Sequence, residues 1–236
     1  MKKYVWKKGI ALIAALALTA GLSFTAFAAE PEDRAPQGAF EGSAWQNPFD
    51  DIRETDWYYH NIEYTYTNNL FSGTSASTFA PNRPMTRGML VTVLGRMSGA
   101  DMIGYTSSFG DVADGAYYAK YTEWAREKGI VSGVGGNSFA PDAIITRQDM
   151  AVMLVRYAAA MGLEAPATHA GAGFADEDSI AAYAKDAATA MQKAGIISGK
   201  PGRIFDPKAG ATRAEVSAML HRFMLLFSDI GDAVAD

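Results

Sequence analysis

The same pattern of residues occurs three times along the chain, and this repetition constrains the fold more than any other feature. Each copy opens with Phe-x-Asp, reaches a Ser-Gly pair, continues to Phe-x-Pro and ends at a Thr-Arg pair. The opening Phe residues are Phe49, Phe109 and Phe174, and the closing Arg residues are Arg87, Arg147 and Arg213. A unit of about 50 residues cannot bury its apolar faces alone, so we expect the three copies to pack on one another.

Each copy predicts a helix, a loop and a second helix, so the predicted fold is all-α. The first helices are predicted at residues 57–68, 117–128 and 181–194, with Asn69, Gly129 and Gly195 just after them. Asn and Gly accept the left-handed conformation that commonly ends a helix. Each second helix begins at the Thr-Arg pair, because the Thr hydroxyl can cap it. Its apolar residues follow at i, i+3, i+4 and i+7, the stripe of a helix that faces a core.

The Arg that opens each second helix is unexpected. A cation there meets the positive end of the helix dipole, which costs roughly 0.3–1 kcal/mol. Two explanations remain open: the Arg binds an external anion at the helix N-terminus, or it pairs with an acid of its own chain. An acid follows three residues after the Thr in the second and third copies, as in a capping box, at Asp149 and Glu215. The first copy has Met89 there.

Residues 1–28 are typical of a signal peptide. Four Lys precede an uncharged apolar stretch, and Ala26-Phe27-Ala28 has the small-x-small form of a cleavage site. We expect cleavage after Ala28. The alternative is an uncleaved membrane anchor, which would be the chain's contact with a membrane. Residues 29–48 are polar, contain Pro and Gly and lack a hydrophobic period, which predicts a flexible lead-in.

Charge and composition exclude several classes of function. The formal charge of the whole chain is −5, and loss of the four leader Lys makes it −9, which argues against a nucleic-acid partner. The chain has no Cys, so it forms neither disulfides nor thiolate metal sites. His60, His169 and His221 lie far apart in unrelated contexts. We therefore expect no metal site, no catalytic site and no cofactor.

The pattern Phe-x-Asp, aromatic helix, Ile-x-Ser-Gly, Phe-x-Pro and Thr-Arg-Ala-Glu resembles the S-layer homology (SLH) repeat of bacterial surface proteins. The resemblance gives repeat 1 at residues 49–97, repeat 2 at 109–157 and repeat 3 at 174–223, followed by a tail at 224–236. It implies an all-helical, pseudo-threefold prism in which the repeats interleave around a central helical bundle.

The resemblance also implies a function. The chain would be a secreted, non-enzymatic protein of the cell wall or cell surface. It would anchor non-covalently to a secondary cell-wall polysaccharide or a peptidoglycan-linked glycan. Often the ligand of this family is a terminal sugar whose pyruvate ketal carries a carboxylate.

The same resemblance implies ligand grooves between neighbouring repeats. In each groove an Arg and backbone N–H groups near a Gly would hold the anion, an aromatic ring would pack on the sugar, and an Asp would accept from its hydroxyls. The matching residues are Arg87, Arg147, Arg213, Gly73, Gly133, Gly199, Trp57, Tyr117, Asp51, Asp111 and Asp176. We expect repeat 3 to lack the aromatic residue, and we favour the grooves of Arg147 and Arg213, where the capping box is better kept.

Each of these residue types also has a structural interpretation. The Gly residues can supply a positive φ in a turn. The Trp and Tyr can lie in the core, and the Asp residues can order the turn before the first helix. The Phe residues of the Phe-x-Asp and Phe-x-Pro motifs are all predicted in the core.

Two other functions remain open. The repeats could form a scaffold or adaptor that binds other surface proteins. A wall-glycan hydrolase is the third candidate, and it needs paired carboxylates about 5–9.5 Å apart. No acidic pair stands out from loop or cap roles, so we expect no enzyme activity.

Overall fold

Helices and connecting loops make up the part of the chain that the structure describes. The structure is a computed structural model that describes residues 45–232, so the predicted signal peptide and most of the predicted lead-in lie outside the described residues. The helices are α2 (Tyr59–Thr67), α3 (Arg87–Met97), α4 (Ala119–Glu127), α5 (Arg147–Ala160), α6 (Lys185–Lys193) and α7 (Arg213–Asp232), with two short 3₁₀ helices, η1 (Glu177–Ser179) and η2 (Ala182–Ala184), before α6. Within residues 45–232 only isolated β-bridges occur besides helices, which confirms the all-α prediction.

The first helix of each repeat begins later than predicted. α2 and α4 start two residues late, and α6 starts after η2. No side chain caps these three starts, so the chain enters each helix through a turn. The predicted ends are confirmed, because Asn69, Gly129 and Gly195 have φ values of 57°, 70° and 72°.

The second helices begin where the sequence predicted. The hydroxyls of Thr86 and Thr146 accept from the N–H three residues later, at 3.3 and 3.2 Å. In repeat 3 the N–H of Thr212 donates to Glu215 Oε2 (2.9 Å), which is the reciprocal bond of a capping box. Repeat 1 lacks that acid, and its helix keeps only the bond to Thr86.

The three Thr-Arg junctions meet through their backbones. Met85 donates its N–H to the carbonyl of Ala211, Ala211 to that of Ile145, and Ile145 to that of Met85, each at 2.9 Å. All three residues are buried. One residue from each repeat thus joins a closed ring of hydrogen bonds, called here the junction ring.

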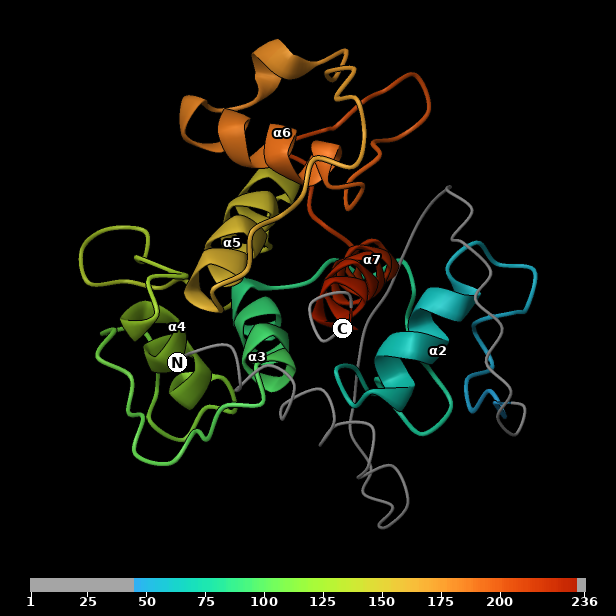
Figure 1. The fold of residues 1–236 in the computed structure, drawn as a ribbon. Coiled ribbons are helices and arrows are strands. Elements are labelled where there is room, and N and C mark those ends of the chain that lie inside the picture. The colour runs from blue at the N-terminus through green and yellow to red at the C-terminus, as the bar shows by residue number, and fades with distance from the viewer. Residues whose placement is uncertain (1–44, 233–236) are drawn as a thin grey trace.

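The helices of neighbouring repeats interleave. Each first helix packs on the second helix of another repeat: α4 on α3, α6 on α5, and α2 on α7. In Figure 1, α3, α5 and α7 lie in the middle, and α2, α4 and α6 lie around them. The contact between α2 and α7 joins the first described repeat to the last.

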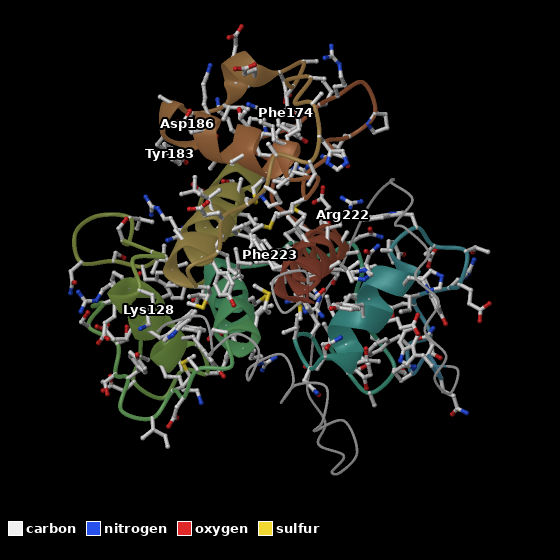
Figure 2. The ribbon with its side chains drawn as sticks, viewed as in Figure 1. Lys128, Phe174, Tyr183, Asp186, Arg222 and Phe223 are labelled. Atoms are coloured by element: carbon white, nitrogen blue, oxygen red, sulfur yellow. The ribbon has the colours of Figure 1, made fainter. Side chains whose placement is uncertain are left out.

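The core is continuous through the three repeats. Its members include the six motif Phe residues, Phe49, Phe79, Phe109, Phe139, Phe174 and Phe205, which confirms their predicted burial. The apolar stripes of the second helices are buried as well. Phe223 of α7 (Figure 2) packs on Tyr157 of α5, with ring centroids 5.7 Å apart. Among residues 45–232, no helix is both long and apolar enough to cross a membrane.

Candidate ligand-binding grooves

The Arg residues of the Thr-Arg pairs reach from their own repeat to the next one. Arg87 donates from Nε to the carbonyl of Phe139 (2.9 Å), and Arg147 does the same to Phe205 (2.6 Å). The guanidinium carbons lie 4.9 and 5.6 Å from the centroids of these two rings. A hydrogen bond and a cation–π contact therefore tie each Arg to the Phe-x-Pro loop of the following repeat.

Arg213 makes the equivalent connection back to repeat 1. It donates to the carbonyl of Ser72 (3.0 Å), and its guanidinium carbon lies 4.5 Å from the centroid of Phe79. Only 3% of Arg213 is exposed. Burial lowers the pKa of Arg213 well below its usual value, and the nearby charge of Arg83 acts in the same direction. The three Arg residues thus fasten the repeats together in a cycle.

The acids after the Thr residues have unequal partners. Glu215 forms a buried ion pair with Arg147, which belongs to the preceding repeat. The structural explanation of the Arg residues therefore holds for Arg147. Asp149 accepts instead from the hydroxyls of Thr146 and Tyr183, both at 2.6 Å, and forms no ion pair with Arg87 within the described residues.

The Asp residues of Phe-x-Asp order the loop that follows the first helix, not the turn that precedes it. Asp51 accepts from the backbone N–H groups of Phe79 (2.7 Å) and Ala80 (2.6 Å). Asp111 and Asp176 accept in the same way from the pairs Phe139 and Ala140, and Phe205 and Asp206. The second residue of each pair has a φ of 55–59°, which a residue with a side chain rarely adopts. The carboxylate stabilises this strained loop.

The Gly residues of the Ser-Gly pairs are required by close packing. Gly133 and Gly199 have φ values of 77° and 84°. A Cβ at Gly73 would lie 2.2 Å from the carbonyl oxygen of Ser75 and 2.6 Å from the ring of Phe49. These loops therefore need Gly whether or not a ligand approaches them.

One pocket brings together three of the predicted ligand residues, one from each repeat: Trp57, Arg147 and Gly199. We call it the Trp57 pocket. It measures about 340 Å³, counting its part open to solvent. The other lining residues are Ile197, Ser198, Lys200, Glu215, Ala218, Met219 and Arg222. Three basic side chains and one acid give it a positive balance.

Trp57, which lines this pocket, is half-buried. Its ring meets that of Tyr58 edge-on, at 5.3 Å between centroids. The indole Nε1 is buried and has no hydrogen-bond partner in the described residues. A buried donor without a partner costs about 1–3 kcal/mol, so an acceptor supplied by a ligand would be favourable here.

The prediction that repeat 3 lacks the aromatic residue is wrong. Tyr183 lies two residues before α6, as Trp57 and Tyr117 lie two residues before α2 and α4. Repeat 3 has one extra residue in its first half, which displaced the match in the sequence. Tyr117 and Tyr183 are 56% and 62% exposed, so neither belongs to the core.

A second set of Arg residues, which was not predicted, also recurs in the three repeats. Arg96, Arg156 and Arg222 each follow nine residues after the Arg of the Thr-Arg pair. Arg222 lines the Trp57 pocket, and Arg96 donates to the carbonyl of Leu70 at 3.2 Å. The same repeat spacing that identified the first set would have found them.

The comparison with known proteins identifies the family. Residues 48–88, 108–151 and 173–217 match the S-layer homology domain. Because these segments cover more than half of the chain, it belongs to the S-layer homology family. The match confirms the three predicted repeats.

Several larger proteins contain a similar region. The chain is 32% identical to an amylopullulanase of Thermoanaerobacterium thermosulfurigenes, over 78% of this chain and 10% of that protein. It is 37% identical to a surface-layer 125 kDa protein of Lysinibacillus sphaericus, over 46% of this chain and 10% of that protein. It is 31% identical to a cellulosome-anchoring protein of Acetivibrio thermocellus, over 50% of this chain and 28% of that protein.

These relatives bear on location and role. The chain spans 10% of the amylopullulanase and 18% of an endoglucanase of a Bacillus strain, and the matched part of each is the SLH region, an anchoring module that is not catalytic. The surface-layer relatives and the family confirm the predicted location at the cell surface or cell wall. They also support a role in anchoring at the cell surface.

Proposed function

We propose that this chain is a non-covalent wall anchor. It binds an anionic, pyruvylated secondary cell-wall polysaccharide in the grooves between its repeats and performs no reaction on it. One observation above all supports the proposal: Trp57, Arg147 and Gly199 line one pocket, although each comes from a different repeat. A pocket that all three repeats build exists only in the folded array.

The groups of the Trp57 pocket suit a carboxylate-bearing sugar. Arg147 uses Nε for Phe205 and one terminal nitrogen for Glu215, which leaves its other terminal nitrogen to a ligand. The indole N–H of Trp57 is a second donor. A charge-assisted hydrogen bond from a guanidinium to a carboxylate is about twice as strong as a neutral one. The pocket would therefore hold the carboxylate at Arg147 and a neighbouring sugar oxygen at Trp57.

We propose further that the repeats form a pseudo-threefold prism around α3, α5 and α7. The junction ring and the contact between α2 and α7 support this arrangement. In a prism of this kind, Trp57, Tyr117 and Tyr183 would stand at equivalent grooves. Arg87, Arg147 and Arg213 would be the matching cations, with Arg147 beside Trp57.

Sedimentation with purified cell walls tests the function. The secreted chain should sediment with walls and stay in solution once acid has removed the secondary polymer and its ketals. Equal binding to stripped walls would point to peptidoglycan. Binding to neither wall, but to proteins of a surface extract, would favour the scaffold or adaptor alternative. Release of sugars from the walls would indicate a hydrolase.

Replacement of Arg147 tests the site. Arg147→Lys keeps the charge but loses the planar fork, so wall affinity should fall by about 10–100-fold, the equivalent of roughly 1.5–3 kcal/mol. Trp57→Phe removes the indole N–H and should weaken binding in the same assay. Arg126→Lys is the matched control, because Arg126 pairs with Glu123 outside the pocket. Normal binding by folded Arg147→Lys and Trp57→Phe variants would contradict this assignment.

A further inference from the structure

The aromatic residue of repeat 3 is held by the protein itself. The Tyr183 hydroxyl donates to Asp149 Oδ1 (2.6 Å) and accepts from Nε2 of Gln148 (3.1 Å). Oε1 of Gln148 in turn accepts the backbone N–H of Ala181 (3.0 Å). Figure 2 shows Tyr183 at the α6 end of the molecule. Residues of repeats 2 and 3 thus bond to each other where our proposal places a ligand groove.

This arrangement occupies both oxygens of Asp149. Oδ1 accepts from Tyr183, and Oδ2 accepts from the Thr146 hydroxyl at 2.6 Å. Partial burial and the bond to Asp149 together raise the pKa of Tyr183 to about 12, so the hydroxyl remains a donor throughout the physiological range. The bond has a charged acceptor, which makes it stronger than a bond between neutral groups.

Arg87 lies close to the bond between Tyr183 and Asp149 but forms no ion pair with Asp149 within the described residues. Burial lowers the pKa of Arg87, and the nearby charge of Asp149 opposes this effect only in part. Within the described residues, Arg87 bonds through Nε to Phe139 and forms no ion pair. Its terminal nitrogens are therefore available to an anion that can reach them.

The Trp57 pocket differs at the equivalent positions. There the acid is Glu215, which Arg147 already binds, and the aromatic residue is Trp57, whose N–H has no partner among the described residues. In the Trp57 pocket the indole N–H has no acceptor among the described residues. In the Arg87 groove Asp149 already accepts from the Tyr183 hydroxyl.

We propose that the hydrogen bond between Tyr183 and Asp149 closes the groove of Arg87, so that this groove accepts a carboxylate-bearing sugar only when the bond opens. This inference rests on the function proposed above. It makes the three grooves unequal: the Trp57 pocket binds first, and the Arg87 groove binds only at higher ligand concentration.

Calorimetric titration of the full chain tests this closure. The probe is a methyl glycoside of an N-acetylhexosamine that carries a 4,6-linked pyruvate ketal, and the same glycoside without the ketal is the ligand control. Tyr183→Phe keeps the ring and removes the hydroxyl. It should bind one more probe molecule per chain than the wild type at the same concentrations. The gain in affinity at this groove should be on the order of tenfold, the value of one hydrogen bond. Asp149→Asn, which removes the charged acceptor, should act in the same direction.

Two further variants identify the added site. Arg87→Gln, combined with Tyr183→Phe, should abolish it. Tyr105→Phe is the matched control, because it removes a Tyr hydroxyl from the connector between repeats 1 and 2 (residues 98–108). It should add no binding site. The proposal is wrong if Tyr183→Phe and Asp149→Asn, both folded by circular dichroism, bind the probe with wild-type stoichiometry and affinity. It is also wrong if the added site survives Arg87→Gln.

Failure of the proposed function would look different. The wild type would then bind no probe, and tryptophan fluorescence would not respond to it. Binding by Tyr183→Phe alone would, in that case, still support the closure. Absence of binding by every variant would overturn both proposals.

Discussion

Single residues of the repeat motif have structural roles that do not depend on a ligand. Asp51 holds two backbone N–H groups, Gly73 admits a neighbouring carbonyl, and Arg147 bonds to the next repeat. The sequence predicted these positions, because the spacing of the motif marks them. It could not predict that Arg147 pairs with Glu215, 68 residues away, because that pairing depends on how the repeats interleave.

Other residues of the candidate site were missed for a different reason. One inserted residue shifted Tyr183 out of the repeat spacing. The structure restores the equivalence, because it aligns helix starts and not residue numbers. Arg222 was missed because an Arg on a helix is ordinarily a solvated side chain, and only the pocket reveals its neighbours.

Replacement of Asp51 should destabilise the chain. Asp51→Ala leaves the N–H groups of Phe79 and Ala80 without their acceptor, and Ala80 is held at a φ of 59°. The loss should be about 1–3 kcal/mol of the free energy of unfolding. Urea denaturation followed by circular dichroism measures it. Asp50→Ala, at the exposed neighbouring position, is the control and should differ from the wild type by far less.

At the scale of elements, the contact between α2 and α7 contains a buried His. His221 of α7 stacks on Tyr64 of α2, with ring centroids 4.0 Å apart and planes 21° apart. Its Nδ1 lies 3.0 Å from Oδ1 of Asn61. The sequence predicts only an ordinary lone His at this position, because no pattern in it shows that α2 and α7 meet.

The burial of His221 predicts a loss of stability in acid. Burial, with smaller effects of Arg222 and His60, lowers the pKa of His221 from 6.5 to about 4. The neutral ring is therefore favoured in the folded state. Its stabilising effect is complete above pH 6.5 and is lost as the pH falls from 6.5 toward about 4. A difference of this size is worth about 3 kcal/mol.

Urea denaturation at pH 7.5, 5.5 and 4.5 measures this effect. His221→Gln removes the titrating ring, and its stability should depend less on pH over this range. His169→Gln is the control, because His169 is exposed, contacts Thr168 and is not among the groups that shift the pKa of His221. An equal pH dependence in the wild type and in His221→Gln would contradict the prediction.

At the scale of the whole molecule, the repeats predicted the helices and their burial but not their closure. Apolar stripes and helix ends would be the same in an open row of repeats. Closure arises from long-range contacts: the junction ring joins Met85, Ile145 and Ala211, and α2 packs on α7. No periodicity in the sequence encodes which repeat is the neighbour of which.

Closure predicts that the described repeats unfold together. A chain that ends at residue 173 lacks α6 and α7, so α2 loses its partner and the junction ring loses Ala211. We expect this fragment to show no cooperative transition in urea, whereas the full chain unfolds in one step. A cooperative transition of the fragment near the midpoint of the full chain would show that closure contributes little.

The junction ring also limits how many copies of the SLH repeat can be added to a protein by gene duplication. Each of its three N–H groups already donates within the ring, so a fourth copy could join the ring only if one of these hydrogen bonds broke. In an open row of repeats, duplication of one unit lengthens the protein and leaves the rest intact. Here the duplication of a single repeat would require the closed ring of three hydrogen bonds to break. We therefore expect longer proteins built from this unit to carry it in multiples of three.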